Sequence, residues 1–331
     1  MTTTLQGRLA LIGGLAAALA LTACATDSGA DTGPGTGGEA KTVQIEDNHG
    51  THEVPVNPAK VVATDSRSFE TLSQWNIELT AAPKRLMSSE LSYRKDESII
   101  DLGTHKEPDL EAIVAAEPDV VINGQRFAQH YADIKKLAPD ATMIELDPRE
   151  GEPLDAELRR QTEGLGKIFD KQDEAAQLVT DFDTSIERVK AAYKSGDKVM
   201  AVITSGGEIN YAAPGSGRTL GPVFDILGLT PALEAEGSTD HQGDDISVEA
   251  IAQSNPDWIL VMDRDAAISA NTGEKYTPAN ELLAESPALK NVTAVQKGQI
   301  VYMPADTYIN ESIQTYTEFF NALAEAMEKA N

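Results

Sequence analysis

The stretch NPDWILVMDR, residues 255–264, repeats the pattern of EPDVVINGQR at residues 117–126. Each copy places Pro-Asp before a run of apolar residues and ends on an arginine. The offset is constant, because 256 minus 118 and 264 minus 126 are both 138. When the EAI triplets at 111–113 and 249–251 are included, six of sixteen positions are identical. A match of this length and spacing indicates an internal duplication.

The duplication extends to whole lobes, since KVVA at 60–63 and KVMA at 198–201 show the same offset of 138. From residue 60 onward, apolar strand patterns alternate with amphipathic helical patterns, which favours parallel sheets built from βαβ units. We therefore predict an α/β fold with two Rossmann-like lobes of mainly parallel strands, at residues 41–154 and 195–331. A hairpin around the His-Gly turn at 49–50 precedes the first lobe.

The segment between the lobes, residues 155–194, has helical periodicity. Leu178, Phe182, Ile186 and Val189 recur at the spacing of one helix face. A helix over residues 171–194 would be roughly 36 Å long, at about 1.5 Å per residue. We predict that one long helix joins the two lobes.

The first 40 residues have a composition of their own. Arg8 and the apolar run 9–21 are typical of a secretory signal, and the run is too short to span a bilayer comfortably. The run ends in Leu-Thr-Ala-Cys, which resembles the lipobox of bacterial lipoproteins, and Cys24 is the only cysteine of the chain. The resemblance implies a signal peptide at 1–23 and a lipid on Cys24. Residues 24–40, rich in Gly, Thr and Asp, are predicted to be a flexible tether.

The overall charge narrows the range of partners. The chain has 27 Lys and Arg against 53 Asp and Glu, a formal net charge of −26, which argues against nucleic acid as a partner. The acidity can equally reflect a need for solubility. It does not exclude an anionic ligand, because charges are screened beyond about 8 Å at physiological salt and a local group of arginines can dominate nearby.

Arginines follow the strands of both lobes. Ligands of open α/β sheets gather at the carboxyl ends of the strands, so Arg126 and Arg264 are expected at the rims of the two lobes. If the lobes face each other, the two guanidinium groups face the same cleft. Arg67, after the first strand of the N-terminal lobe, is expected to add a further cation.

The chain resembles the periplasmic-type binding lipoproteins of iron-siderophore and vitamin B12 ABC importers. The similarity covers nearly all of residues 41–328. This resemblance implies two α/β lobes joined by a rigid helix, no enzymatic activity, no intrinsic cofactor, and a lipid-anchored protein outside the cytoplasm. We expect a monomer. The segments that carry the resemblance are EVPVNPAKVVATD at 53–65, PDLEAIVAAEPDVVI at 108–122, APGSGRTLGPVFDILGL at 213–229 and SVEAIAQSNPDWILVMDR at 247–264.

Within that class the sequence is most similar to binders of ferric catecholate siderophores. The resemblance implies that basic residues surround an anionic chelate, and that a histidine and a tyrosine can fill iron positions that the chelate leaves open. The candidate iron ligands are thus His241 and Tyr308. The matching siderophore-binding positions are Lys84, Arg67, Arg126, Arg218, His241, Arg264 and Tyr308.

Two glutamates, Glu111 and Glu249, are also 138 residues apart. In the wider class, one glutamate on each lobe docks against arginines of the membrane permease, and the resemblance implies this role here. A local explanation also applies, because acidic residues in the first turn of a helix interact favourably with its dipole by about 0.3–1 kcal/mol.

The sequence also allows other ligands on the same fold and other classes of protein. Ferric hydroxamate, haem and cobalamin suit the same fold, but a hydroxamate complex is less negative and does not call for three arginines. A bare metal ion needs converging ligands, and the five histidines are scattered. A surface enzyme or adhesion lipoprotein is less favoured, because PGSGRTLG lacks the Lys-Ser/Thr ending of a phosphate-binding loop and no G-x-S-x-G or H-E-x-x-H motif occurs.

Overall fold

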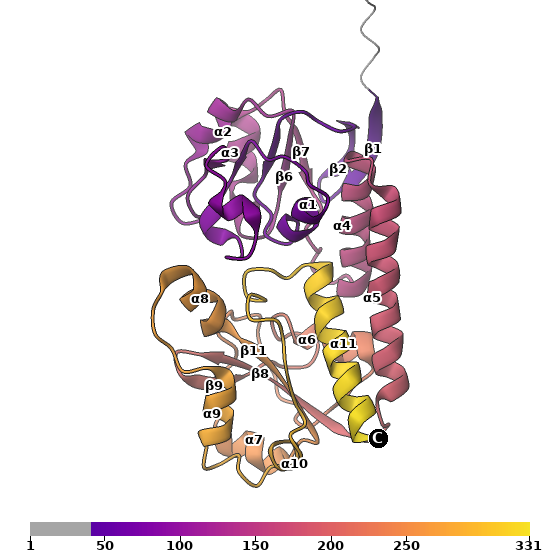
Figure 1. The fold of residues 1–331 in the computed structure, drawn as a ribbon, viewed down its shortest axis with the longest axis vertical. Coiled ribbons are helices and arrows are strands. Elements are labelled where there is room, and N and C mark those ends of the chain that lie inside the picture. The colour runs from indigo at the N-terminus through magenta and orange to yellow at the C-terminus, as the bar shows by residue number, and fades with distance from the viewer. Residues whose placement is uncertain (1–40) are drawn as a thin grey trace, which may run out of the picture. The chain divides into compact units, whose positions relative to one another are not determined.

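The computed structural model describes residues 41–331 (Figure 1). The predicted signal peptide 1–23, the lipidation site Cys24 and the tether 24–40 lie outside the described residues. The described part begins with the expected hairpin. Strands β1 (Thr42–Asp47) and β2 (Gly50–Pro55) pair antiparallel, with Asp47 opposite Gly50.

The N-terminal lobe is built on a five-stranded parallel sheet of order β5-β4-β3-β6-β7. The first, second and third helices flank it. These elements are β3 (Val61–Ala63), β4 (Ala81–Ala82), β5 (Ile100–Asp101), β6 (Val120–Asn123), β7 (Thr142–Glu145), α1 (Phe69–Gln74), α2 (Leu110–Ala116) and α3 (Tyr131–Leu137), with 3₁₀ turns η1 (Lys84–Leu86), η2 (Ser92–Lys95) and η3 (Gln125–His130).

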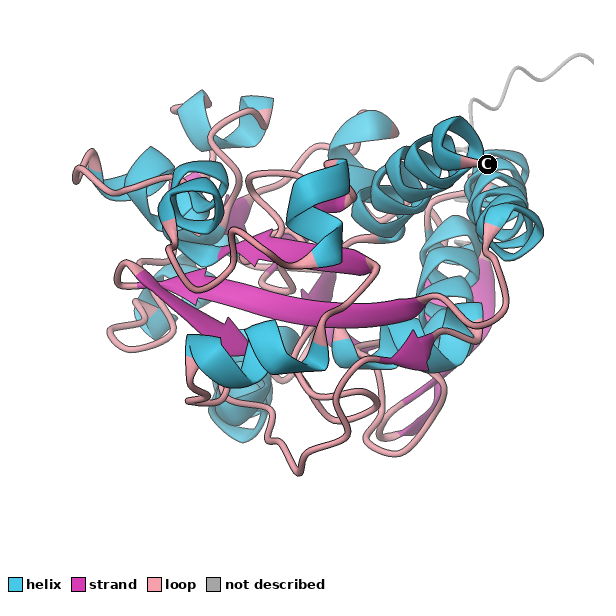
Figure 2. Cartoon of the chain, turned by 90° about the horizontal axis from the view of Figure 1, so that it is seen from below, coloured by secondary structure: helices cyan, strands magenta, loops and turns pink. Residues whose placement is uncertain are grey.

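The C-terminal lobe has a similar sheet, in which β10, β8, β11 and β12 are parallel and β9 pairs antiparallel with β8. Helices lie on both sides of the strands (Figure 2). The mainly parallel, two-lobed α/β prediction is confirmed. The elements are β8 (Lys198–Ser205), β9 (Glu208–Tyr211), β10 (Thr230–Pro231), β11 (Trp258–Asp263), β12 (Ile300–Tyr302), α6 (Gly221–Leu227), α7 (Val248–Ser254), α8 (Arg264–Thr272), α9 (Ala279–Glu285) and α10 (Thr293–Lys297).

The sequence repeat corresponds to a repeat of strand register. Val61 of β3 pairs with Val120 of β6, and the residues 138 positions later, Val199 of β8 and Trp258 of β11, pair in the same way. A one-residue slip would turn every side chain to the opposite face of a sheet. The conserved register therefore brings the arginines that follow β6 and β11 to equivalent places in the two lobes.

The helices that precede these strands repeat as well. Asp109 caps α2 by accepting a hydrogen bond from the backbone N–H of Ala112, and Ser247 caps α7 by accepting one from Ala250. Both helices end on a left-handed residue, Glu117 at φ 45° and Asn255 at φ 42°. The same local chemistry thus starts and ends the two helices, and each helix leads into an interior strand of its sheet, β6 or β11.

The connection between the lobes contains the expected long helix and a second helix that precedes it. Helix α4 (Leu154–Ile168) and helix α5 (Gln172–Ala192) are separated by a turn in which Asp170 has φ 54°. The 21-residue α5 is the long helix that the periodicity predicted. It packs against α4 and against the C-terminal helix α11 (Ile313–Ala330), and the three lie side by side along the two lobes (Figure 1).

One apolar core runs through both lobes. The cluster that contains Val61 of the N-terminal sheet also contains Phe182 of α5, Phe320 of α11 and Val199 of the C-terminal sheet. The rings of Phe182 and Phe320 stack with centroids 5.9 Å apart. Separate clusters cover the outer face of each sheet. Because burial of this shared core fixes the lobes against the helices, their relative placement does not depend on a flexible linker.

Candidate functional site

Three arginines from both lobes converge on one aromatic ring. Arg126 lies in η3 after β6, Arg264 begins α8 after β11, and Arg218 lies in the loop between β9 and α6. Their guanidinium carbons are 4.8, 4.8 and 5.0 Å from the ring centre of Tyr308, respectively. Cations within about 6 Å of an aromatic ring are attracted by its π-electrons. Tyr308, only 8% exposed, is therefore the common platform of the three guanidinium groups.

The three arginines line a cavity of about 630 Å³. The N-terminal lobe contributes Arg126 and the loop at 104–106, and the C-terminal lobe contributes Arg218, Arg264 and His241. With Lys106, the lining holds four permanently basic side chains, and no carboxylate is among its residues. In a chain with a net charge of −26, such a lining is a local concentration of positive charge that suits an anion.

The guanidinium groups are only partly satisfied by the protein. Arg126 donates from Nη2 to the backbone carbonyl of Tyr308 at 3.3 Å, and Arg264 donates from Nη1 to Ser205 Oγ at 3.0 Å. The Nε atoms of Arg218 and Arg264 are buried and have no hydrogen-bond partner within residues 41–331. Unmade hydrogen bonds of buried donors are unfavourable, so a ligand rich in oxygen atoms suits this site. Burial lowers the pKa of the Arg126 guanidinium, and the nearby Arg218 charge lowers it further.

An adjoining cavity of about 570 Å³ shares Arg126 and Arg218 with the first. Arg67 lies there and donates to Asp147 Oδ1 at 2.6 Å and to Glu311 Oε2 at 2.9 Å. The structure therefore places Arg67 in one cavity with Arg126 and Arg218, but both of its terminal nitrogens already have carboxylate partners. Glu311, which the sequence reasoning missed, is among the most buried acidic residues of the site.

The other predicted contacts differ in position. His241 lines the first cavity, and its ring centre is 6.5 Å from that of Tyr308. Burial and the charge of Arg264 lower the pKa of His241, which favours its neutral form. Lys84 donates from Nζ to the carbonyl of Asp96 at 2.5 Å and does not line either cavity. His105, which the sequence reasoning did not single out, lines the first cavity from a loop with no recognisable motif.

The two glutamates proposed to meet a permease are both exposed. Glu111 and Glu249 lie in the first turns of α2 and α7, at equivalent places in the two lobes. Neither forms an ion pair within the described part of the chain. The duplication thus presents one free carboxylate on each lobe.

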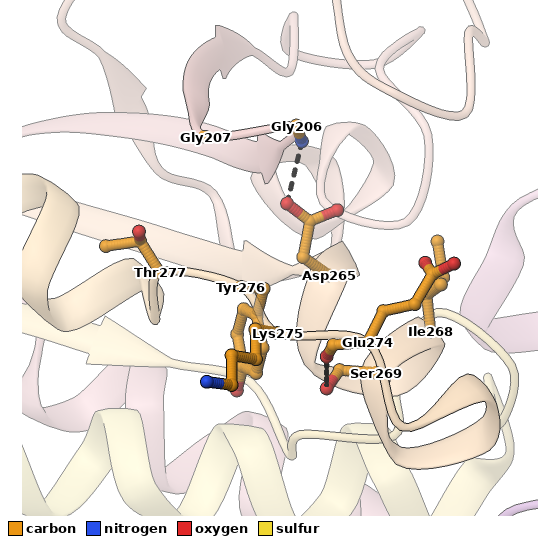
Figure 3. Close-up of a pocket in the computed structure, with 9 residues that line it drawn as sticks. All are labelled: Gly206, Gly207, Asp265, Ile268, Ser269, Glu274, Lys275, Tyr276 and Thr277. Carbon is orange, nitrogen blue, oxygen red and sulfur yellow. Dashed lines mark hydrogen bonds between the residues drawn. The ribbon is translucent and has the colours of Figure 1, made fainter.

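A separate cavity of about 390 Å³ lies in the C-terminal lobe between the β8–β9 turn and α8 (Figure 3). Asp265 accepts a hydrogen bond from the backbone N–H of Gly206 at 2.7 Å, and Ser269 donates to the carbonyl of Glu274 at 2.5 Å. The lining contains two carboxylates and one lysine, so it offers no excess of positive charge. Of these two cavities, the one around Tyr308 has the lining that an anion site would need.

Two further findings concern metals and membranes. Within residues 41–331, no group of three or more His, Asp or Glu side chains is arranged to hold a metal ion. In the same part of the chain, no helix has both the length and the apolar character needed to cross a bilayer.

Two α/β lobes with a ligand-sized cationic cavity between them define a two-lobed solute-binding protein. The sequence profile of the periplasmic binding protein family matches residues 61–307, and the chain belongs to that family. It is accordingly an extracytoplasmic binding protein and not an enzyme, as the sequence resemblance implied.

Two of the similar proteins are siderophore-binding proteins of Bacillus subtilis and Vibrio anguillarum. The petrobactin-binding protein YclQ of Bacillus subtilis is 30% identical over 95% of this chain and 97% of its own length. Its crystal structure matches with a TM-score of 0.74, covering 87% of this chain and 99% of that one. The ferric-anguibactin-binding protein FatB of Vibrio anguillarum is 29% identical over 80% of this chain and 81% of its own length.

A buried acid behind the site leads to a pH prediction. Asp65, at the end of β3, is fully buried and accepts hydrogen bonds from Gln161 Nε2 at 2.6 Å and from the backbone N–H of Arg67 at 3.0 Å. Burial, with a further contribution from the Asp147 charge, raises the pKa of Asp65 from 3.8 to about 7. The folded state therefore binds this proton more tightly than the unfolded state does.

Deprotonation of Asp65 is therefore less favourable in the folded state, and it lowers the free energy of unfolding as the pH rises from about 4 to 7. Above pH 7 this decrease is complete and stays constant. The isosteric variant Asp65→Asn should unfold at higher urea concentration than the wild type at pH 8. The two proteins should become alike toward pH 4. Urea unfolding at pH 4, 6 and 8 measures the difference, and equal pH profiles for the two proteins would contradict the prediction.

Proposed function

We propose that this protein captures a ferric siderophore, of the anionic catecholate type, in the cavity around Tyr308 and delivers it to an ABC permease for iron uptake. The observation that carries the proposal is the convergence of Arg126, Arg218 and Arg264 on one ring in a cavity without carboxylates. The names of two relatives, which bind petrobactin and ferric anguibactin, support this class of cargo.

The chemistry of the cargo fits the arginines. A ferric tris-catecholate carries about three negative charges on a rounded surface edged with oxygen atoms, and planar guanidinium groups offer several donors to such oxygens. Each charge-assisted hydrogen bond contributes roughly 1.5–3 kcal/mol. Three arginines thus supply enough free energy to distinguish an anionic chelate from a neutral one of similar size.

Contact with iron itself is a second mode of binding at the same place. His241 and Tyr308 line one cavity, so both side chains are available to a chelate that leaves coordination positions open. A hexadentate chelate leaves none and would be held by the arginines alone. The arginine contacts therefore do not depend on iron ligation.

We further propose that the protein is a lipoprotein. The sequence up to Cys24 supports cleavage of a signal peptide and attachment of lipid to the Cys24 thiol, and the Gly-, Thr- and Asp-rich composition of residues 24–40 supports a flexible tether. Acyl chains contribute roughly 0.8 kcal/mol per buried CH₂, so several chains keep the binding protein at the membrane that holds its permease.

The cargo class is tested by titrating the purified protein with ferric tris-catecholate, ferrioxamine-type hydroxamate, haem and cobalamin, followed by calorimetry. We expect the catecholate to bind at least about 100-fold more tightly than the hydroxamate, a difference of roughly 2.8 kcal/mol. Apo-catecholate and ferric chloride alone serve as controls. Tighter binding of hydroxamate, haem or cobalamin would contradict the catecholate assignment and identify that ligand as the cargo.

The arginines are tested one at a time. Arg126→Ala, Arg218→Ala and Arg264→Ala should each weaken catecholate binding at least about tenfold, or roughly 1.4 kcal/mol, because each removes charge-assisted contacts. Arg188→Ala is the matched control, since Arg188 pairs with Glu328 on the outer helices. Wild-type affinity in all three variants would mean that these arginines do not contact the ligand.

Permease docking is tested separately from ligand binding. Glu111→Gln and Glu249→Gln together should reduce iron uptake at least about tenfold in proteoliposomes that contain the permease, if two charge-assisted contacts are lost. Affinity for the siderophore should not change. Glu187→Gln, on the exposed side of α5, is the control. Normal uptake by the double variant would contradict the docking role, and the two glutamates would then only interact with the dipoles of α2 and α7.

A further inference from the structure

One buried carboxylate connects the arginines of the two lobes. Glu311 lies three residues after Tyr308, and its side chain is 4% exposed. Its Oε2 atom accepts hydrogen bonds from Arg67 Nη2 at 2.9 Å and from Arg218 Nη2 at 3.4 Å. Arg67 follows the first strand of the N-terminal lobe, whereas Arg218 belongs to the C-terminal lobe. Glu311 is thus an anion shared across the cleft.

Glu311 is charged at physiological pH. Burial alone would raise its pKa, but the charges of Arg218 and Arg67 and a hydrogen bond from Thr219 outweigh burial and lower it to about 2. The cavity around Tyr308 has no carboxylate of its own, and Arg218 has no other carboxylate partner in the described part of the chain. When no ligand is bound, Glu311 is therefore the anion that offsets repulsion between Arg218 and its neighbours.

The residue next to Arg218 has an unusual backbone conformation. Thr219 has φ 63°, a region that β-branched residues rarely occupy. Its hydroxyl donates to Glu311 Oε1, and its carbonyl accepts a hydrogen bond from the buried Tyr316 hydroxyl at 3.1 Å. These two bonds hold Thr219 in a conformation that it would otherwise leave. The direction in which Arg218 leaves the backbone depends on this turn.

We propose that Glu311 is a positioning residue that fixes Arg218, through its guanidinium and through Thr219, in the orientation that the anionic ligand requires. The inference deepens the proposed function and rests on it. An arginine that is ordered before binding loses less side-chain freedom when the ligand arrives, which strengthens the complex. The effect should be seen mainly in the dissociation rate, since buried charge pairs influence dissociation more than association.

The direction of the effect separates positioning from simple electrostatics. Glu311→Gln removes a negative charge beside the cavity, which by itself would strengthen attraction for an anionic chelate. We expect the reverse, with dissociation of ferric tris-catecholate at least about tenfold faster in stopped-flow measurements and association changed less than about threefold. The control is Glu318→Gln, an exposed carboxylate on α11. Unchanged or slower dissociation in Glu311→Gln would overturn the proposal.

A second pair of variants covers the case in which Glu311→Gln does not fold. Thr219→Val keeps the branched shape but loses the hydroxyl, and it should speed dissociation by about threefold, the effect of one ordinary hydrogen bond. Thr219→Ser keeps the hydroxyl and should dissociate like the wild type. Equal rates for the Val and Ser variants would count against the role of the Glu311 contact.

A measurement without ligand keeps this inference separate from the cargo assignment. Phenylglyoxal modifies accessible arginine side chains, and mass spectrometry follows the reaction at Arg218. In ligand-free protein, Glu311→Gln should be modified at Arg218 at least about threefold faster than the wild type, as expected on loss of a hydrogen bond, and Glu318→Gln should not. If the wild type bound no ferric chelate, the proposed function would be wrong. The modification rate at Arg218 would still test whether Glu311 positions this arginine. An unchanged rate would refute the positioning whatever the cargo.

Discussion

Three guanidinium groups of like charge surround one tyrosine ring, so the surrounding structure must hold them against their mutual repulsion. Tyr308 offers its π-electrons to all three, and Glu311 offers a buried carboxylate to Arg218. Both residues lie in the loop that leads into α11, which is packed against α5. The positive charge of the cavity is thus anchored to the helices that join the lobes, and an anion that enters completes the charge balance.

The duplication explains how two of these arginines reach the same cavity. In each lobe a capped helix ends on a left-handed residue and passes through Pro-Asp into a central strand, and the arginine follows that strand. The side chain of the aspartate accepts a hydrogen bond from the backbone of the neighbouring strand, Asp119 from Lys60 at 2.8 Å and Asp257 from Lys198 at 2.9 Å. The repeated residues therefore fix register, and register fixes where Arg126 and Arg264 emerge.

Much of the fold and part of the site could be predicted from the sequence because they depend on local patterns. The hairpin, the two mainly parallel lobes and the placement of Arg126 and Arg264 after strands follow from periodicity and from the repeat. Helix α4, which precedes the predicted long helix and is separated from it by the turn at Asp170, does not follow from the repeat. Glu311 was missed because its partners are 93 and 244 residues away in sequence. The ion pairs of Arg67 with Asp147 and Glu311 could not be predicted for the same reason, because they join residues 80 and 244 positions apart.

A shared core also determines how binding free energy can be used. Since one apolar cluster connects both sheets to α5 and α11, moving the lobes far apart would expose Phe182, Phe320 and their neighbours to water. A protein of this kind gains affinity from groups that are already in place, because little reorganisation remains to offset the contacts. The guanidinium groups of Arg218 and Arg264, the Tyr308 ring that both contact and the Glu311 carboxylate that holds Arg218 are such groups. The large apolar core supplies the stability that offsets the repulsion between the arginines during folding. Under the proposed function, the ligand would then bind to arginines that are already oriented.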